Sequence, residues 1–250
     1  ITFSDTTVAL SGDATDLAVA LAGTTNHTGA VTVTNTTDYT ITELKVINAG
    51  TSGAITFSDT TLALSGDATD LAIALAGTTN HSGAVTVSNA SDYTATELQT
   101  INNGTAGTIT LSDRTVALSG SGTVVAAALD GTFAGAGSHT GAVTVSGDDY
   151  TGAQLKTINA ATSGEITLSD RTVAISGDAT DLAVALGGTF AAGGSHTGAV
   201  TVSSTTDYTV TELKVINAAT SGAITFSDTT VALSGDATDL AVALGGTFAA

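Results

Sequence analysis

The sequence contains no cysteine, methionine, tryptophan or proline, and it has only five lysine and arginine residues. Without cysteine the chain has no disulfide framework, and composition gives no further information on its redox compartment. The 23 aspartate and glutamate residues give a formal net charge of −18 at pH 7. This charge argues against nucleic acid and anionic membranes as partners, because clustered lysine and arginine bind both.

Long apolar runs are also missing. No run approaches the roughly 18 residues of a membrane-spanning helix, and no signal peptide is visible. The apolar residues, 42% of the chain, recur instead in a regular pattern, which is typical of a folded protein rather than a disordered one. An acidic, sulfur-free chain rich in threonine, glycine, alanine and serine is typical of a bacterial surface protein, so we expect an extracellular or cell-surface location.

What the sequence does contain is a repeat at two levels. The segment ITFSD or ITLSD begins at residues 1, 55, 109, 166 and 224, and the shorter segment VTV begins at residues 31, 85, 143 and 200. A fixed period of this size predicts a stack in which each repeat contacts mainly its neighbours. We therefore expect a single array over residues 1–250. Its repeats are expected at about 1–54, 55–108, 109–165 and 166–223, with a partial repeat at 224–250. Neither end resembles a polar cap, so we also expect an excerpt of a longer array.

The first half of each repeat predicts two short strands and a helix. In residues 1–10 apolar residues alternate with polar ones, and Ser11-Gly12 is expected to interrupt this pattern. Asp13 is a good N-cap with Asp16 at the third helical position, and Gly23 is expected to end the helix.

The second half follows the same plan. Thr40 and Glu43 have the spacing of a capping box. The same spacing recurs at Thr94/Glu97, Thr151/Gln154 and Thr209/Glu212. The chain is therefore predicted to be a repeat solenoid, β-helix-like, with stacked coils of short parallel strands and one short helix per coil. An asparagine recurs after each of these helices, and we expect a buried structural ladder that satisfies backbone groups. Its members are Asn48, Asn102, Asn159 and Asn217.

Threonine occupies the middle of every first strand, and these residues form a candidate binding face. They are Thr2, Thr32, Thr56, Thr86, Thr110, Thr144, Thr167, Thr201 and Thr225. If their apolar neighbours point inward, the hydroxyls form a column at about 4.8 Å per strand, which resembles the ice-binding face of an antifreeze β-solenoid. Ordinary solvent-facing strand residues explain the same pattern, and so does lateral packing between flat strand faces.

The acidic residues suggest weak calcium binding, since calcium prefers several oxygen ligands. The candidate ligands are Asp5, Asp13, Asp16, Asp59, Asp67 and Asp70. The alternative is that Asp13 and Asp16 serve as helix caps that complement the helix dipole. Coils of the same type are expected about 10 Å apart, which is too far for one ion to bridge. Apart from calcium, no cofactor is expected.

The four histidines and the nucleophilic residues give no catalytic pattern. His27, His81, His139 and His196 occur once per repeat in a turn, where packing on a neighbouring coil is expected rather than zinc binding. No G-x-S-x-G motif accompanies the serines, so enzymatic activity is not expected.

The segments LSGDATDLAVAL and DYTxTELKxINAATSGxITxSD resemble the tandem repeats of very large bacterial cell-surface proteins, notably those of marine cyanobacteria. This resemblance implies a secreted, surface-attached structural or adhesive role, and it carries over no functional residue. The leading hypothesis is a structural repeat protein of an extracellular filament, surface layer or cell-surface fibre. Its expected partners are copies of itself, joined head-to-tail or laterally. The alternative is a binding module, either an ice-binding face or the extender of an adhesin.

Overall fold

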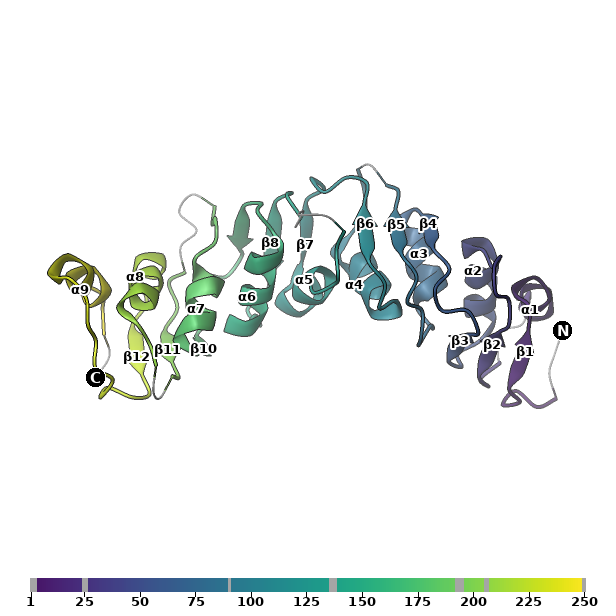
Figure 1. Cartoon of the computed structure of the whole chain (residues 1–250), viewed down its shortest axis with the longest axis horizontal. Coiled ribbons are helices and arrows are strands. Elements are labelled where there is room, and N and C mark those ends of the chain that lie inside the picture. The colour runs from purple at the N-terminus through teal and green to yellow at the C-terminus, as the bar shows by residue number, and fades with distance from the viewer. Residues whose placement is uncertain are drawn as a thin grey trace. The chain divides into compact units, whose positions relative to one another are not determined.

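The computed structural model describes residues 4–23, 27–89, 91–134, 139–191, 196–204 and 207–248 (Figure 1). The chain forms two compact units. The first comprises Ile1–Val116 with Gly131–Gly137, and the second comprises Ala117–Asp130 with Ser138–Ala250. In both units short parallel strands alternate with single helices, so the predicted α/β repeat is confirmed.

The helices fall into two types according to the half of the repeat that contains them. The first-type helices of the described chain follow an LSG or ISG segment, which forms a strand before each of them except the last. They are α1 (Ala14–Leu21), α3 (Ala68–Leu75), α5 (Gly122–Leu129), α7 (Ala179–Leu186) and α9 (Ala237–Ala243). The second-type helices follow a VTV strand and are α2 (Ile41–Gly50), α4 (Ala95–Gly104), α6 (Gly152–Ala161) and α8 (Val210–Ala219). Successive helices within each unit pack against each other.

The strands of the first unit form two parallel sheets of three strands each, in the orders β1-β2-β3 and β4-β5-β6. Their strands are β1 (Leu10–Gly12), β2 (Val31–Val33), β3 (Ile55–Phe57), β4 (Leu64–Gly66), β5 (Val85–Val87) and β6 (Ile109–Leu111). The second unit also has two such sheets, in the orders β7-β8-β9 and β10-β11-β12. Their strands are β7 (Leu118–Ser121), β8 (Val143–Ser146), β9 (Ile166–Leu168), β10 (Ile175–Gly177), β11 (Val200–Val202) and β12 (Ile224–Phe226).

The order of strands within the sheets corrects two expectations. Ser11-Gly12 does not break the chain, because both residues belong to β1 and pair with Thr32 and Val33 of β2. The segment between two helices can therefore carry two strands with different partners. Strand β3 pairs with β2, which precedes it in the chain, whereas β4 pairs with β5, which follows it. In the described chain the ladder of this first sheet continues past β3 only as an isolated bridge between Ile55 and Thr78. The ladder therefore divides into separate sheets where a single column was expected.

Local capping explains where the helices begin. The Asp13 carboxylate accepts a hydrogen bond from the backbone N–H of Asp16 at 2.8 Å, and Gly23 adopts a φ of 77° just after α1. All four predicted capping boxes are present, as at Thr40 and Glu43. Each satisfies backbone donors that a helix start would otherwise leave unpaired. The predicted starts of both helix types are thus confirmed.

The core lies between the strands and the helices. Val31 and Val33 of β2 are completely buried, while Thr32 between them is partly exposed. Leu44 and Ile47 of α2 are completely buried as well. Each fully buried side chain of this size contributes roughly 1.5–3 kcal/mol. Because the helices of the described chain have at most ten residues, none of them could cross a lipid bilayer.

Candidate functional site

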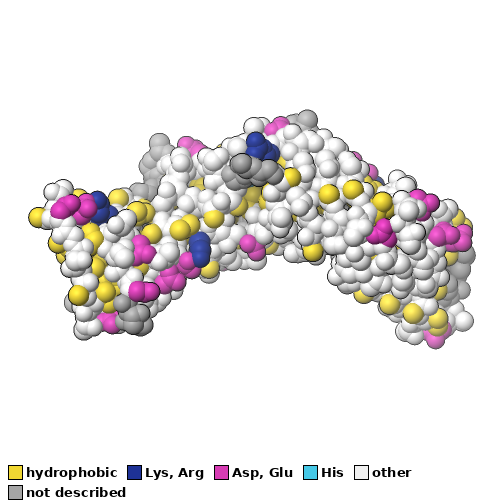
Figure 2. All heavy atoms as spheres, in the orientation of Figure 1, with side chains coloured by type: hydrophobic (Ala, Val, Ile, Leu, Met, Phe, Trp, Pro, Cys, Tyr) yellow, Lys and Arg dark blue, Asp and Glu magenta, His cyan; other side chains and the backbone are white. Residues whose placement is uncertain are grey.

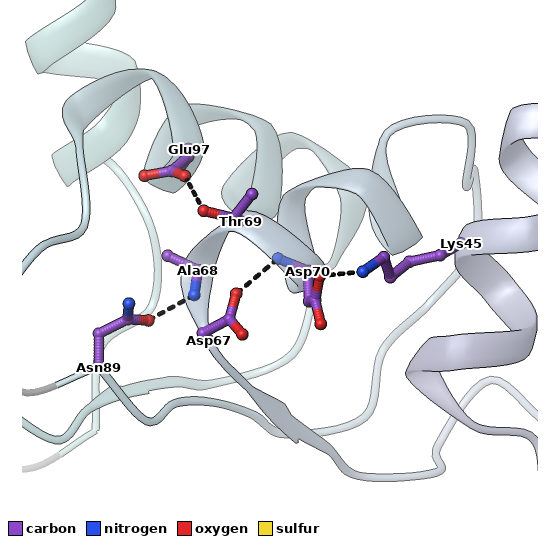
Figure 3. A network of polar contacts seen from close by, with 7 residues as sticks. All are labelled: Lys45, Asp67, Ala68, Thr69, Asp70, Asn89 and Glu97. Carbon is purple, nitrogen blue, oxygen red and sulfur yellow. Dashed lines mark hydrogen bonds and ion pairs between the residues drawn. The ribbon is translucent and has the colours of Figure 1, made fainter.

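The most prominent polar feature is a network at the start of α3, which Figure 3 shows from close by. The Asp67 carboxylate accepts a hydrogen bond from the backbone N–H of Asp70 at 2.8 Å and so caps the helix. The Asp70 side chain in turn forms an ion pair with Lys45 of α2. Asn89, which follows β5, accepts a hydrogen bond from the backbone N–H of Ala68. The start of α3 is therefore held by segments that precede it and segments that follow it.

Glu97 of α4 completes this network. One of its carboxylate oxygens, Oε1, accepts a hydrogen bond from the Thr69 hydroxyl of α3 at 2.6 Å. The other, Oε2, accepts bonds from the backbone N–H and the hydroxyl of Thr94, at 2.9 and 2.8 Å. Burial alone would raise the pKa of Glu97, but the hydrogen bonds from Thr69 and Thr94 outweigh it and hold the pKa below its usual value. A single carboxylate thus closes its own capping box and binds the preceding helix.

The same contacts recur in both units. In the first turn of a first-type helix, a threonine hydroxyl donates a hydrogen bond to a glutamate carboxylate of the next second-type helix. The pairs are Thr15–Glu43 and Thr180–Glu212, both at 2.6 Å. At Thr123 the direction reverses, because the Gln154 amide donates to the Thr123 hydroxyl at 3.0 Å. Second-type helices contact the next first-type helix through the ion pairs Lys156–Asp181 and Lys214–Asp239. The polar network is therefore a repeated junction rather than a unique site.

The lysines of these junctions were not singled out from the sequence, although a signal for them exists. Each lysine is followed by its aspartate 25 residues later, as in Lys45–Asp70. In the repeat where glutamine replaces lysine, at Gln99, the residue 25 positions later is Val124 rather than aspartate. Both members of the pair change together, which is the pattern expected of a coupled contact.

The candidate calcium ligands Asp5 and Asp59 each support a turn. The Asp59 carboxylate accepts hydrogen bonds from the backbone N–H and the hydroxyl of Thr61, at 2.8 and 2.7 Å, and Asp5 accepts the same pair from Thr7. The backbone hydrogen bond and then the hydroxyl hydrogen bond lower the pKa of both carboxyl groups. The backbone oxygen of Asp59 also accepts a bond from the buried Tyr39 hydroxyl at 3.0 Å.

The remaining calcium candidates lie at helix starts. Asp13 and Asp67 accept the capping hydrogen bonds of α1 and α3, and Asp70 is the partner of Lys45. Asp16 donates its backbone N–H to Asp13. Within the described ranges, no three histidine or acidic side chains come together as metal ligands. Calcium binding stays a prediction that needs its own experiment.

The threonine face consists of separate rows. In each sheet a serine of the first strand stands beside the threonines of the next two strands. The rows are Ser11-Thr32-Thr56, Ser65-Thr86-Thr110, Ser119-Thr144-Thr167 and Ser176-Thr201-Thr225. Thr2 lies outside the described residues. The Thr32 and Thr56 hydroxyls lie 3.2 Å apart and share a hydrogen bond. Over the residues that the structure describes, the expected uninterrupted column is thus divided into four short rows, because each sheet there has three strands.

The recurring asparagines contact the backbone of the next helix. Asn48 donates its side-chain N–H to the carbonyl oxygen of Ile73 at 2.8 Å, and Asn159 donates to Val184 at 2.6 Å. Asn217 donates to Val242 at 2.7 Å. Asn102 occupies the corresponding position near the end of α4. All four side chains are half-buried rather than buried, and three of them satisfy helix carbonyls instead of turn groups.

Three histidines bridge segments from different parts of the repeat. His81 is 1% exposed, and its Nε2 lies 3.0 Å from the carbonyl oxygen of Leu62. A carbonyl only accepts, so Nε2 carries the proton, and in the neutral ring Nδ1 accepts from the Thr105 hydroxyl at 2.8 Å. His27 and His196 make the same pair of contacts. Burial lowers the pKa of His81 and His196, which favours the neutral ring.

A comparison of the chain with models of known protein families, with curated proteins and with solved structures finds no match. The chain's own residues form repeated contacts between neighbouring helices and rows of hydroxyl groups on the strands.

Proposed function

We propose that this chain is a structural repeat protein of an extracellular filament, surface layer or cell-surface fibre, an α/β solenoid whose function is mechanical and not catalytic. The observation that carries this proposal is the repetition of the junction contacts. Lys45–Asp70, Lys156–Asp181 and Lys214–Asp239 occupy equivalent places in three of the four full repeats, and the repeat with Gln99 differs at both positions. A catalytic or receptor site is needed once, whereas a contact that links neighbours is needed at every repeat.

Charge favours the strand faces as the surfaces through which copies associate. The strand rows present neutral serine and threonine hydroxyls, while every first-type helix except α5 begins with two aspartates. Two copies that each carry −18 repel one another least where their carboxylates are farthest from the contact. Lateral packing of strand faces is therefore one mode of association in this proposal. Head-to-tail stacking is the other, since a heterologous contact that does not close yields fibres.

Electron microscopy of the purified protein tests the proposal. The protein is imaged with millimolar calcium and again with an excess of chelator. Ordered fibres or sheets whose axial repeat matches whole coils support it, and a loss of order with chelator adds calcium to the assembly. Isolated short particles in both conditions, at concentrations up to the solubility limit, contradict self-association.

The hydroxyl rows support a second candidate, a binding module. In the first unit Thr86 and Thr110 are opposite one another in one row, beside Ser65. Such a neutral, regularly spaced hydroxyl surface fits an ordered array of water or sugar hydroxyls. Tyrosine at Thr86 and Thr110 should abolish inhibition of ice growth if this face binds ice. The matched control is Thr96→Tyr on the exposed side of α4. If the wild type, the double variant and the control inhibit ice growth equally, or if the wild type does not inhibit it, the ice-binding hypothesis is contradicted.

A further inference from the structure

A groove runs across three consecutive helices of the first unit, and neither proposed function uses it. It has a volume of about 550 Å³, and residues of α1, α2 and α3 line it. Leu21, Val46, Ala49 and Ile73 form its apolar part. Lys45 lies at its edge, where it pairs with Asp70.

The groove belongs to an apolar stripe that is open to solvent. Val19 is 71% exposed and Ile73 is 40% exposed, although both are β-branched apolar residues on helices. Val46 lies between them on α2 and is half-buried. Single exposed apolar residues need no explanation, but these three stand at equivalent places on consecutive helices, and Val46 and Ile73 both line the groove.

An acidic row accompanies this stripe. Asp16, Glu43 and Asp70 each stand three residues before Val19, Val46 and Ile73, and residues three apart share one face of a helix. This acidic row lies beside the groove, whose own lining has Lys45 as its charged residue. Asp70 pairs with Lys45, and Glu43 accepts hydrogen bonds from Thr15 and Thr40 while it keeps its negative charge. Figure 2 shows acidic side chains lying among hydrophobic ones on the visible face of the molecule. The helix surface of the first unit thus combines apolar anchors with negative charge.

We propose that this surface binds a cationic amphipathic helix. Helices that pack side by side are about 8–10 Å apart, so the three apolar positions recur at about that distance. In a bound helix, residues seven apart are separated by about 10.5 Å along the axis and lie on nearly the same face. The occupant therefore has apolar residues at every seventh position and lysine or arginine on the flank that faces Asp16 and Glu43. A second copy of this chain does not fit, because it would bring the same negative charge to an acidic surface.

A synthetic peptide tests the proposal directly. The probe is a helix of roughly 18 residues with leucine at every seventh position and lysine on one flank, labelled for fluorescence anisotropy. We expect saturable one-to-one binding that weakens as salt is raised from about 20 mM to about 500 mM, because screening shortens the Debye length. Replacement of the peptide's leucines by serine should weaken binding roughly tenfold or more, since apolar anchors dominate such contacts.

Protein variants locate the site. Val46→Thr with Ile73→Ala removes two anchors, and the chain itself has threonine and alanine at the equivalent positions Thr100 and Ala127. This variant should fold normally and bind the peptide roughly tenfold more weakly. Thr96→Ala, on the exposed side of α4 and outside the groove, should leave binding unchanged. Equal binding by the serine-substituted peptide means unspecific attraction to a polyanion and overturns the proposal. Absence of any binding, or unaltered affinity of the Val46/Ile73 variant, overturns it as well.

Discussion

Replacement of Glu97 by alanine should destabilise the first unit by about 1.5–2 kcal/mol. The change removes the two bonds that Oε2 accepts from Thr94, and loss of a helix cap of this kind costs about 1 kcal/mol. It also removes the bond from the Thr69 hydroxyl, which contributes roughly 0.5–1 kcal/mol for a half-buried pair. Glu97→Gln should cost less than about 0.5 kcal/mol, because Gln154 makes the equivalent contacts to Thr151 and Thr123.

The assay is urea unfolding at pH 7, followed by far-ultraviolet circular dichroism. Repeat arrays can unfold in steps, so the earliest transition is compared and its slope is checked for each variant. The free energy of unfolding should fall in the order wild type, Glu97→Gln, Glu97→Ala. Two results would refute this prediction. One is that Glu97→Ala has the same free energy of unfolding as the wild type, and the other is that Glu97→Gln lowers it as much as Glu97→Ala does.

The pKa of Glu97 adds a pH test to the same variant. Because the folded-state pKa lies below the unfolded value, the stabilisation is complete above about pH 4.5 and is lost as the pH falls through the folded pKa. The difference between wild type and Glu97→Ala should therefore shrink at pH 3. A difference that stays constant with pH would show that the lost contacts do not involve the ionised carboxylate.

Three further predictions concern other contacts. Acid should destabilise the protein, because the lowered pKa values of buried His81 and His196 give stability that is present above about pH 6.5 and is lost as the pH falls below it. The double variant His81→Gln with His196→Gln should therefore show a smaller difference between its urea midpoints at pH 7 and pH 5 than the wild type. An unaltered difference would contradict this. Gly107→Ala should destabilise the folded protein by about 2–3 kcal/mol or more, because the added Cβ would lie 1.8 Å from the carbonyl oxygen of Gly83. In the control Gly12→Ala the added Cβ meets nothing closer than 3.6 Å. Equal thermal midpoints of the two variants would contradict the close packing at Gly107. Burial raises the pKa of Tyr39, Tyr93 and Tyr150 to about 12, so absorbance at 295 nm should show little tyrosinate at pH 10, and half-ionisation there would be inconsistent with their burial.

The helix starts could be predicted because their determinants lie within four residues of one another. Asp13 reaches the backbone of Asp16, and Thr40 reaches Glu43, so the caps are visible in any short window of sequence. Glycine after the first helix was predictable for the same reason, since Gly23 takes a left-handed conformation there.

The strand partners could not be predicted from such windows. Leu64–Gly66 and Ile55–Phe57 lie in one segment, but they pair with different strands, and nothing local distinguishes their partners. The same limit applies to the polar junction. Lys45 and Asp70 are 25 residues apart, and only the comparison of repeats within the chain indicates that they meet.

The division of the strands into separate sheets determines how damage spreads through the first unit. The ladder of strand β3 continues only as the bridge from Ile55 to Thr78, because β4 begins a new ladder. The two sheets are joined instead by side-chain and helix contacts, such as the Phe57–Asn80 hydrogen bonds and the packing of α2 on α3. If one sheet opens, the next therefore keeps its own strand ladder and loses the contacts that join it to its neighbour. Amide exchange should then show stronger protection within each ladder than in the connecting segment Ser58–Ala63.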